Sequence, residues 1–78
     1  MTQRTSPTTG DRVRSALALA RKNQTQAGAA AGISQSQFSR RVNGTRAWRA
    51  GELEKVAALC GVAVESLLGS DYREVVAA

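Results

Sequence analysis

The first apolar stripe of the chain has the i, i+3, i+4, i+7 spacing of one helix face and consists of Val13, Ala16, Leu17 and Ala20. Thr8 and Asp11 stand in the S/T-x-x-D/E relation that begins many helices, because each residue can bond the backbone of the other. The pattern predicts a helix that follows Thr8 and runs to about Lys22. The polar residues before it, 1–8, are expected to form a disordered N-terminal tail.

A second, shorter helix is predicted from a new capping sequence. Asn23 and Gln26 have the N-x-x-Q relation, and the helix should continue through Ala31. Gly28 weakens a helix interior by roughly 1 kcal/mol relative to alanine, so its presence indicates that another part of the backbone approaches closely. Gly32 suits the left-handed residue that ends a helix.

A third helix is predicted to begin almost at once. Ser34 and Gln37 repeat the capping relation, and the helix should run to about Val42, where Asn43-Gly44 stops it. Two short helices that are joined so tightly must cross at a steep angle.

The rest of the chain predicts two further helices and a tail. A fourth helix from about Ala50 carries one apolar face, which consists of Leu53, Val56, Ala57 and Cys60. A short fifth helix before Gly69 is supported by Val64, Leu67 and Leu68. The fold class predicted for residues 9–69 is therefore all-α, a compact domain of five helices, and residues 70–78 form a C-terminal tail.

Charge is distributed unevenly along the chain, which has 11 Lys and Arg against 6 Asp and Glu. Between residues 12 and 51 no residue is acidic, and the basic ones are Arg12, Arg14, Arg21, Lys22, Arg40, Arg41, Arg46 and Arg49. From Glu52 onward acidic residues outnumber basic ones. Such a basic stretch is typical of a domain that binds a polyanion, either nucleic acid or an anionic membrane. The plainer reading is a solvated basic surface.

Several kinds of chemistry are not supported by the composition. The chain has no His and one Cys, so we expect no zinc site, no Cys/His or Ser/His catalytic arrangement, no other cofactor and no enzymatic activity. No apolar run approaches the roughly 18 to 20 residues that span a bilayer, and the N-terminus does not resemble a signal peptide. A single Cys60 forms no internal disulfide, so we expect the cytoplasm, a reducing compartment.

The segment NQTQAGAAAGISQSQFSRRVNG, residues 23–44, resembles the helix-turn-helix of phage repressors of the lambda repressor and Cro type, also called the XRE family. The likeness extends from about residue 12 to residue 68, and within it the segment GELEKVAALCGVAVESLL, residues 51–68, resembles the last two helices of that family. The resemblance implies a lambda-repressor-like DNA-binding domain, with the second and third helices as the helix-turn-helix. It also implies a transcriptional regulator of a phage or a bacterium that binds double-stranded DNA.

The resemblance and the pattern of the third helix together give candidate site residues. Phe38 and Val42 fall on one side of that helix, and Ser36 and Arg40 fall on the other. The residues expected to contact bases are Gln35, Ser36, Ser39 and Arg40. The residues expected to contact DNA phosphates are Gln24, Asn43, Arg46 and Arg49. Gln amides pair well with adenine and Arg guanidinium groups with guanine in the major groove.

Other residues in and near this segment are expected to have structural roles. Gln37 should serve as the capping partner of Ser34, and Arg41 should be an ordinary solvated arginine. Trp48 should fill the core against the fourth helix, and Cys60 should be buried in the core.

Proteins of this type commonly bind pseudo-palindromic sites as dimers, so a homodimer on DNA is expected. The candidate dimer contacts lie in the C-terminal tail and are Tyr72, Val75 and Val76. Two alternatives remain open from the sequence. The domain can be a protein-interaction module, such as an antitoxin or anti-repressor, or an architectural protein that coats DNA without reading its sequence.

Overall fold

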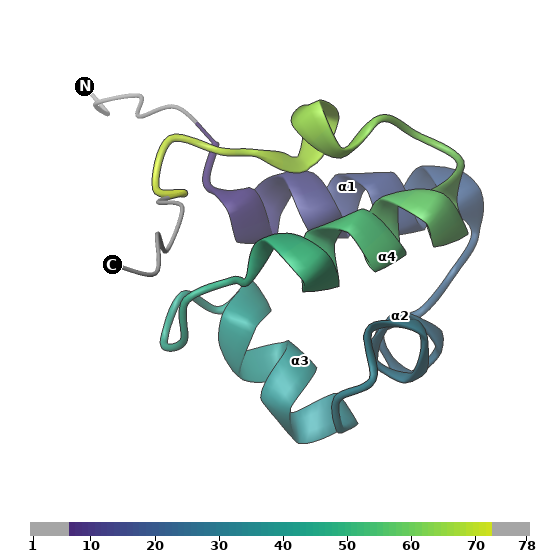
Figure 1. The fold of residues 1–78 in the computed structure, drawn as a ribbon, viewed down its shortest axis with the longest axis horizontal. Helices are drawn as coiled ribbons and strands as arrows, with labels where there is room; N and C mark the ends of the chain where they lie inside the picture. Colours follow the sequence, from purple (N-terminus) through teal and green to yellow (C-terminus); the bar gives the residue numbers. More distant parts are fainter. Residues whose placement is uncertain (1–6, 73–78) are drawn as a thin grey trace.

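Four α-helices and one short 3-10 helix make up residues 7–72, the part of the chain that the computed structural model describes (Figure 1). The elements are α1 (Thr9–Ala20), α2 (Gln24–Ala31), α3 (Gln35–Val42), α4 (Ala50–Cys60) and the 3-10 helix η1 (Val64–Leu67). Residues 7–72 contain no strand, so this part of the chain is all-α, as the sequence predicts. No helix within these residues is long and apolar enough to cross a bilayer.

Helix α4 lies at the centre of the fold and packs against α1, α2 and η1, while α3 packs against α1 and α2. In Figure 1, α1 and η1 occupy the upper side of the molecule, and α2 and α3 the lower side. The largest fully buried apolar side chains come from four of the five elements and are Phe38, Leu53, Leu67, Val13 and Val56. This shared core fixes the direction in which α3 presents its outer face.

The capping sequences that predicted the first three helices are present as capping boxes. The Asp11 backbone N–H donates to Thr8 Oγ1 over 3.1 Å, and the Gln26 N–H donates to Asn23 Oδ1 over 2.8 Å. In each box the acid or amide side chain accepts a bond from the backbone of the capping residue in return. These predicted helix starts are confirmed, because the first N–H groups of a helix need such acceptors.

The turn between α2 and α3 is tight for reasons visible at two glycines. Gly32 ends α2 with a φ of 78°, the left-handed conformation that its position predicts. At Gly28 an added β-carbon would lie 3.2 Å from the carbonyl oxygen of Ile33 and 3.6 Å from Phe38 Cβ. The close backbone approach expected at Gly28 is therefore present. In Figure 1, α2 is seen end-on and α3 from the side, so the two helices cross steeply.

Two boundaries differ from the prediction. Helix α1 ends at Ala20 rather than at Lys22, because Arg21 takes a left-handed conformation with a φ of 58°. The Lys22 N–H then donates to the Leu17 carbonyl over 2.9 Å and closes the helix end. The expected fifth helix is not an α-helix. It is the four-residue 3-10 helix η1, which ends at Leu67.

The first and last parts of the described segment, around Pro7 and Asp71, meet beside the start of α1. The backbone N–H of Thr9 donates to Asp71 Oδ1 over 2.7 Å, and the N–H of Ser70 donates to the Pro7 carbonyl over 3.0 Å. Pro7 and Thr8, which the sequence assigned to a tail, are thus tied to the fold, and so is the beginning of the expected C-terminal tail. Residues 1–6 and 73–78 of these tails lie outside the described residues.

Candidate nucleic-acid interface

Helix α3 has one buried face and one exposed face. Phe38 and Val42, which helical spacing places on one side of α3, are both buried in the core. Gln35, Ser36 and Arg40 are exposed, whereas Ser39 is half-buried. Three of the four residues expected to contact bases are thus accessible on one short helix, and Ser39 lies at the margin of this surface. We call the exposed surface of Gln35, Ser36 and Arg40 the polar face of α3.

The side chain of Gln37 is engaged in capping α3. Its Oε1 accepts the backbone N–H of Ser34 over 3.0 Å, and its own N–H donates to Ser34 Oγ over 3.1 Å. The prediction that Gln37 caps the helix is confirmed. The capping box fixes the first turn of α3, the turn that carries Gln35 and Ser36.

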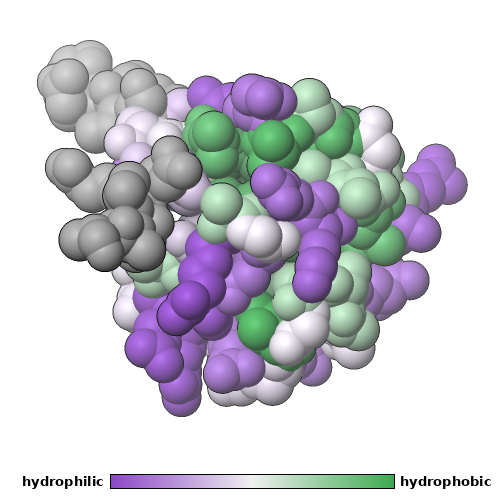
Figure 2. Space-filling model, in the orientation of Figure 1, coloured by the Kyte–Doolittle hydropathy of each residue, from purple (hydrophilic) through white to green (hydrophobic). Residues whose placement is uncertain are grey.

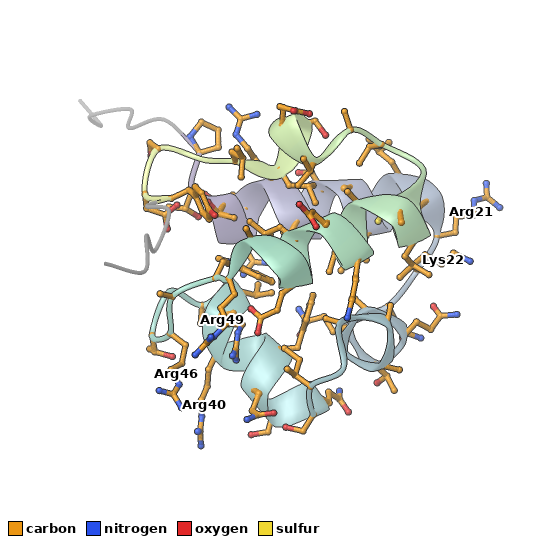
Figure 3. The ribbon with its side chains drawn as sticks, viewed as in Figure 1. Arg21, Lys22, Arg40, Arg46 and Arg49 are labelled. Atoms are coloured by element: carbon orange, nitrogen blue, oxygen red, sulfur yellow. The ribbon has the colours of Figure 1, made fainter. Side chains whose placement is uncertain are left out.

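Three exposed arginines lie together beside the end of α3. Figure 3 shows Arg40, Arg46 and Arg49 on the same side of the molecule, with Arg40 on α3 and the other two on the loop before α4. Figure 2 shows hydrophilic residues gathered in the corresponding lower-left region. Because like charges repel when they are left alone, such a cluster favours an anionic partner. We call these three residues the arginine cluster.

The loop that carries two of these arginines is fixed to the end of α3. The backbone N–H and Oγ1 of Thr45 both donate to the Arg40 carbonyl, over 2.9 and 3.0 Å. The N–H of Gly44 donates to the Arg41 carbonyl over 3.2 Å. Asn43, a predicted phosphate contact, is exposed at this junction. The loop and helix therefore present their donors in one arrangement rather than independently.

Arg41 is not the solvated arginine that the sequence reading expected. Its side chain is buried, and Nε lies 2.9 Å from Glu52 Oε1 in an ion pair between α3 and α4. Nη1 of Arg41 also donates to the Gln37 carbonyl over 3.1 Å, and the same Glu52 oxygen accepts the Arg49 N–H over 3.0 Å. One carboxylate thus connects helix α3, the basic loop and the start of α4.

A signal for this ion pair was present in the sequence. Arg41 follows Phe38 by three residues, so it falls on the apolar side of α3 rather than on the polar side. A buried charge needs a partner, and Glu52 is the first acidic residue after a long basic stretch. The prediction of a solvated arginine was wrong because the position of Arg41 on the helix, and not its residue type, decides its burial.

Trp48 anchors the basic loop from inside. It is buried and packs edge-to-face on Phe38, with ring centroids 5.4 Å apart and planes at 83°. The prediction that Trp48 fills the core is confirmed. Its Nε1 is buried without a hydrogen-bond partner among the described residues. Trp48 stands between Arg46 and Arg49 in the sequence, so the packing of its ring on Phe38 holds the loop with both arginines against α3.

The remaining predicted residues take separate places. Gln24 is half-buried at the first position of α2, where it is free to offer part of its amide. Tyr72 is half-buried and packs against the core, while Val75 and Val76 lie outside the described residues. Cys60 is half-buried rather than fully buried, and burial raises the pKa of its thiol.

No arrangement within residues 7–72 offers three or more His, Cys, Asp or Glu side chains to a metal ion. The surface built by α3 and its loop offers amide, hydroxyl and guanidinium groups instead. These groups donate hydrogen bonds, and the guanidinium groups carry positive charge. They suit acceptors on an anionic partner.

These features define a small all-α domain whose outer helix presents polar side chains beside a fixed arginine cluster. The family model of the BetR domain matches residues 6–77, and the chain belongs to the BetR domain family. Neither a curated protein nor a solved structure shows significant similarity to the chain.

Proposed function

We propose that this protein binds double-stranded DNA in a sequence-specific manner and regulates transcription. In this proposal α2, the Gly32 turn and α3 form a helix-turn-helix, and the polar face of α3 enters the major groove. The observation that carries the proposal is the joint placement of that face and the arginine cluster on a helix and loop that are fixed to each other. A groove-reading surface needs this combination, because base contacts specify and phosphate contacts position.

The polar face supplies groups that match base edges. Gln35 in the first turn of α3 can pair with adenine through its amide, and Arg40 can pair with guanine through its guanidinium. Ser36 offers a hydroxyl between them, and the half-buried Ser39 would contact at most the edge of the site. Each good bidentate pair is worth roughly 1 to 3 kcal/mol of discrimination against a wrong base.

The arginine cluster supplies the phosphate contacts in this proposal. Arg46 and Arg49 are exposed on the loop that follows the reading helix, where the DNA backbone would pass. Asn43 joins them at the end of α3. Gln24 lies at the N-terminus of α2, where backbone N–H groups and the helix dipole favour a phosphate.

Family membership and resemblance support the same proposal. BetR domains are small helical domains that are often described as helix-turn-helix-like. The finer assignment, a lambda-repressor-like regulator of the Cro or XRE type that acts in the cytoplasm, rests on the resemblance of residues 23–44 and 51–68. In that assignment two copies bind a pseudo-palindromic site, and the C-terminal segment from Tyr72 joins them.

Selection of bound duplexes from a random pool tests the proposal. The salt should be about 150 mM, where non-specific affinity is typically only around 10⁻⁴ to 10⁻⁶ M. We expect enrichment of a defined sequence, and a two-fold symmetric one if the protein binds as a dimer. Uniform binding with a steep salt dependence would leave an architectural DNA binder. No binding at all would leave a protein-interaction module and withdraw the proposal.

A further inference from the structure

A groove on the α1 side of the molecule is not used by the proposed DNA contact. It has a volume of about 720 Å³ and lies between α1 and the segment around residues 60–66. The lining residues that matter for the argument are Arg12, Ala16, Leu19, Ala20, Cys60 and Val62. We call this feature the α1 groove. Its volume falls within the range of roughly 300 to 1,000 Å³ that is usual for binding sites.

The lining of the α1 groove is more apolar than polar, and its polar members are Asp11, Arg12, Ser15 and Ser66. Part of this apolar surface is not needed to build the core. The core face of α1 is already formed by Val13 and Leu17, which are buried. Leu19 is nevertheless 87% exposed, and Val62 is 39% exposed. Single exposed leucines are ordinary, but here Leu19 and Val62 line one groove together with Ala16 and Ala20. Apolar side chains that line a groove make it a candidate contact site.

The charges around the groove favour an acidic partner. Arg12 lines it, and neither Arg12 nor Lys22 forms an ion pair within residues 7–72. Lys22 lies close enough to Cys60 for its positive charge to oppose the effect of burial on the pKa of the thiol. Figure 3 shows Arg21 and Lys22 together beyond the end of α1. The groove therefore has unpaired positive charge near both of its ends.

Two acidic residues, Asp11 in the lining of the groove and Glu65 beside it, do not cancel this charge. Asp11 is occupied, because its carboxylate accepts the Thr8 backbone N–H over 3.1 Å and pairs with Arg14 at 3.5 Å. Glu65 on η1 is exposed beside Ser66, and it leaves the basic groups in excess. A second copy of this chain would bring the same basic groups together, so repulsion disfavours it as the occupant.

The length of the groove suits a bound α-helix. Its lining runs from Pro7, just before α1, to Ala20 at the end of that 12-residue helix. At a rise of 1.5 Å per residue that helix is about 18 Å long, which matches about three turns of a partner helix. Amphipathic helices bind such grooves through apolar residues at i, i+3, i+4 and i+7.

We propose that the α1 groove binds an amphipathic helix of another protein, with an apolar face that covers Leu19 and Val62 and a polar face of carboxylates that meets Arg12 and Lys22. In Figure 1, α1 and η1 lie on the side of the molecule away from the outer surface of α3. The helix partner and DNA would thus not compete for the same surface. The proposal does not depend on DNA binding.

Two synthetic helical peptides of about 12 residues provide the test, since that length matches α1. Both have leucines at i, i+3, i+4 and i+7, and the polar positions are glutamate in one and lysine in the other. Binding is measured by fluorescence anisotropy, and the site is mapped by backbone amide shifts in NMR. We expect the glutamate peptide alone to bind and to shift amides that line the α1 groove.

Variants of exposed residues separate this site from general charge attraction. Leu19→Gln should weaken the binding of the glutamate peptide by about tenfold or more, because it removes one apolar contact that the peptide would bury. Arg12→Gln should weaken it several-fold in a salt-sensitive way, whereas Lys55→Gln, the same charge change on exposed α4 surface, should have little effect. Circular dichroism confirms that each variant is folded.

Three outcomes would overturn the proposal. The lysine peptide binding as tightly as the glutamate peptide would remove the charge argument. If neither peptide binds, the α1 groove is not a binding site for an amphipathic helix. A dimer of the free protein that Leu19→Gln dissociates would show that a second copy covers the groove. Duplex selection is unaffected by any of these results, so the proposed DNA function stands or falls separately.

Discussion

The polar face of α3 and the α1 groove are both exposed, yet they differ in chemistry. On α3 the apolar residues Phe38 and Val42 are both buried, and only polar side chains face outward. On α1 the apolar residues exceed what the core takes up, and Leu19 remains almost fully exposed. Packing in the core accounts for the apolar residues on the inner faces of both helices. The difference between their outer faces is the reason we propose different partners, a polyanion for α3 and an amphipathic helix with acidic side chains on its polar face for α1.

The largest effect expected on stability would come from breaking the ion pair behind the polar face of α3. Glu52→Ala leaves Arg41 buried without its partner and removes the acceptor of the Arg49 N–H, so it should cost about 3 kcal/mol or more. Urea unfolding measures this loss. The isosteric Glu52→Gln keeps an oxygen acceptor and should cost less.

The same pair gives a sharper control. Arg41→Met combined with Glu52→Leu replaces both charges by apolar groups of similar size, so it should cost less than Glu52→Ala, and its remaining cost is the lost bond from the Arg49 N–H. If Glu52→Ala costs less than about 1 kcal/mol, the pair is not an anchor of α3. The lining of the α1 groove should show unchanged amide shifts in every one of these variants.

Arg40→Ala and Arg12→Ala form a matched test of the two surfaces, because each removes one exposed arginine. Arg40→Ala should cost about 1 to 3 kcal/mol of discrimination for the selected duplex, since it removes a pairing with a base. Arg12→Ala should leave DNA discrimination unchanged and weaken the glutamate peptide. Anisotropy titrations of both ligands against both variants give the four values. Equal effects of the two variants on DNA would show that only overall charge matters.

Arg46→Gln and Arg49→Gln should weaken DNA binding without changing which sequence is preferred. Each variant removes one proposed phosphate contact, so the slope of log affinity against log salt should fall in magnitude by about 0.9. Titrations at several salt concentrations on the selected and a scrambled duplex measure this. A loss confined to the selected duplex would move these arginines from phosphate contact to base reading.

A small gain is expected at a site that belongs to neither surface. Gly51 lies in the first turn of α4, and an added β-carbon there meets nothing within 4 Å. Gly51→Ala should therefore stabilise the fold by up to about 1 kcal/mol, because alanine restricts the unfolded chain more than glycine does. Thermal unfolding checks the direction. A decrease in stability would show that the backbone near Arg49 needs the glycine.

Local sequence rules predicted much of this fold because they act over a few residues. Ser34 and Gln37 sit three positions apart and cap α3 as expected, and Gly32 takes the left-handed conformation expected of it. Phe38 and Val42 follow from helical spacing alone. These features depend on near neighbours, which a sequence displays directly.

Features that depend on contacts between distant segments were missed. Arg21 ends α1 in a conformation that favours glycine, and no residue there predicts it. The bond from Thr9 to Asp71 joins positions far apart in the chain, so this contact was not expected. The α1 groove likewise forms only when residues around Cys60 and Val62 come to lie beside α1.

The most direct test of the account is an NMR titration of the protein with the selected duplex. If the polar face of α3 reads DNA, the largest amide shifts will fall on Gln35, Ser36 and Arg40 and on the loop of the arginine cluster. Amides around Leu19 and Val62 will stay nearly unchanged. Largest shifts along the α1 groove, with α3 unaffected, would contradict the account and assign DNA to the other surface.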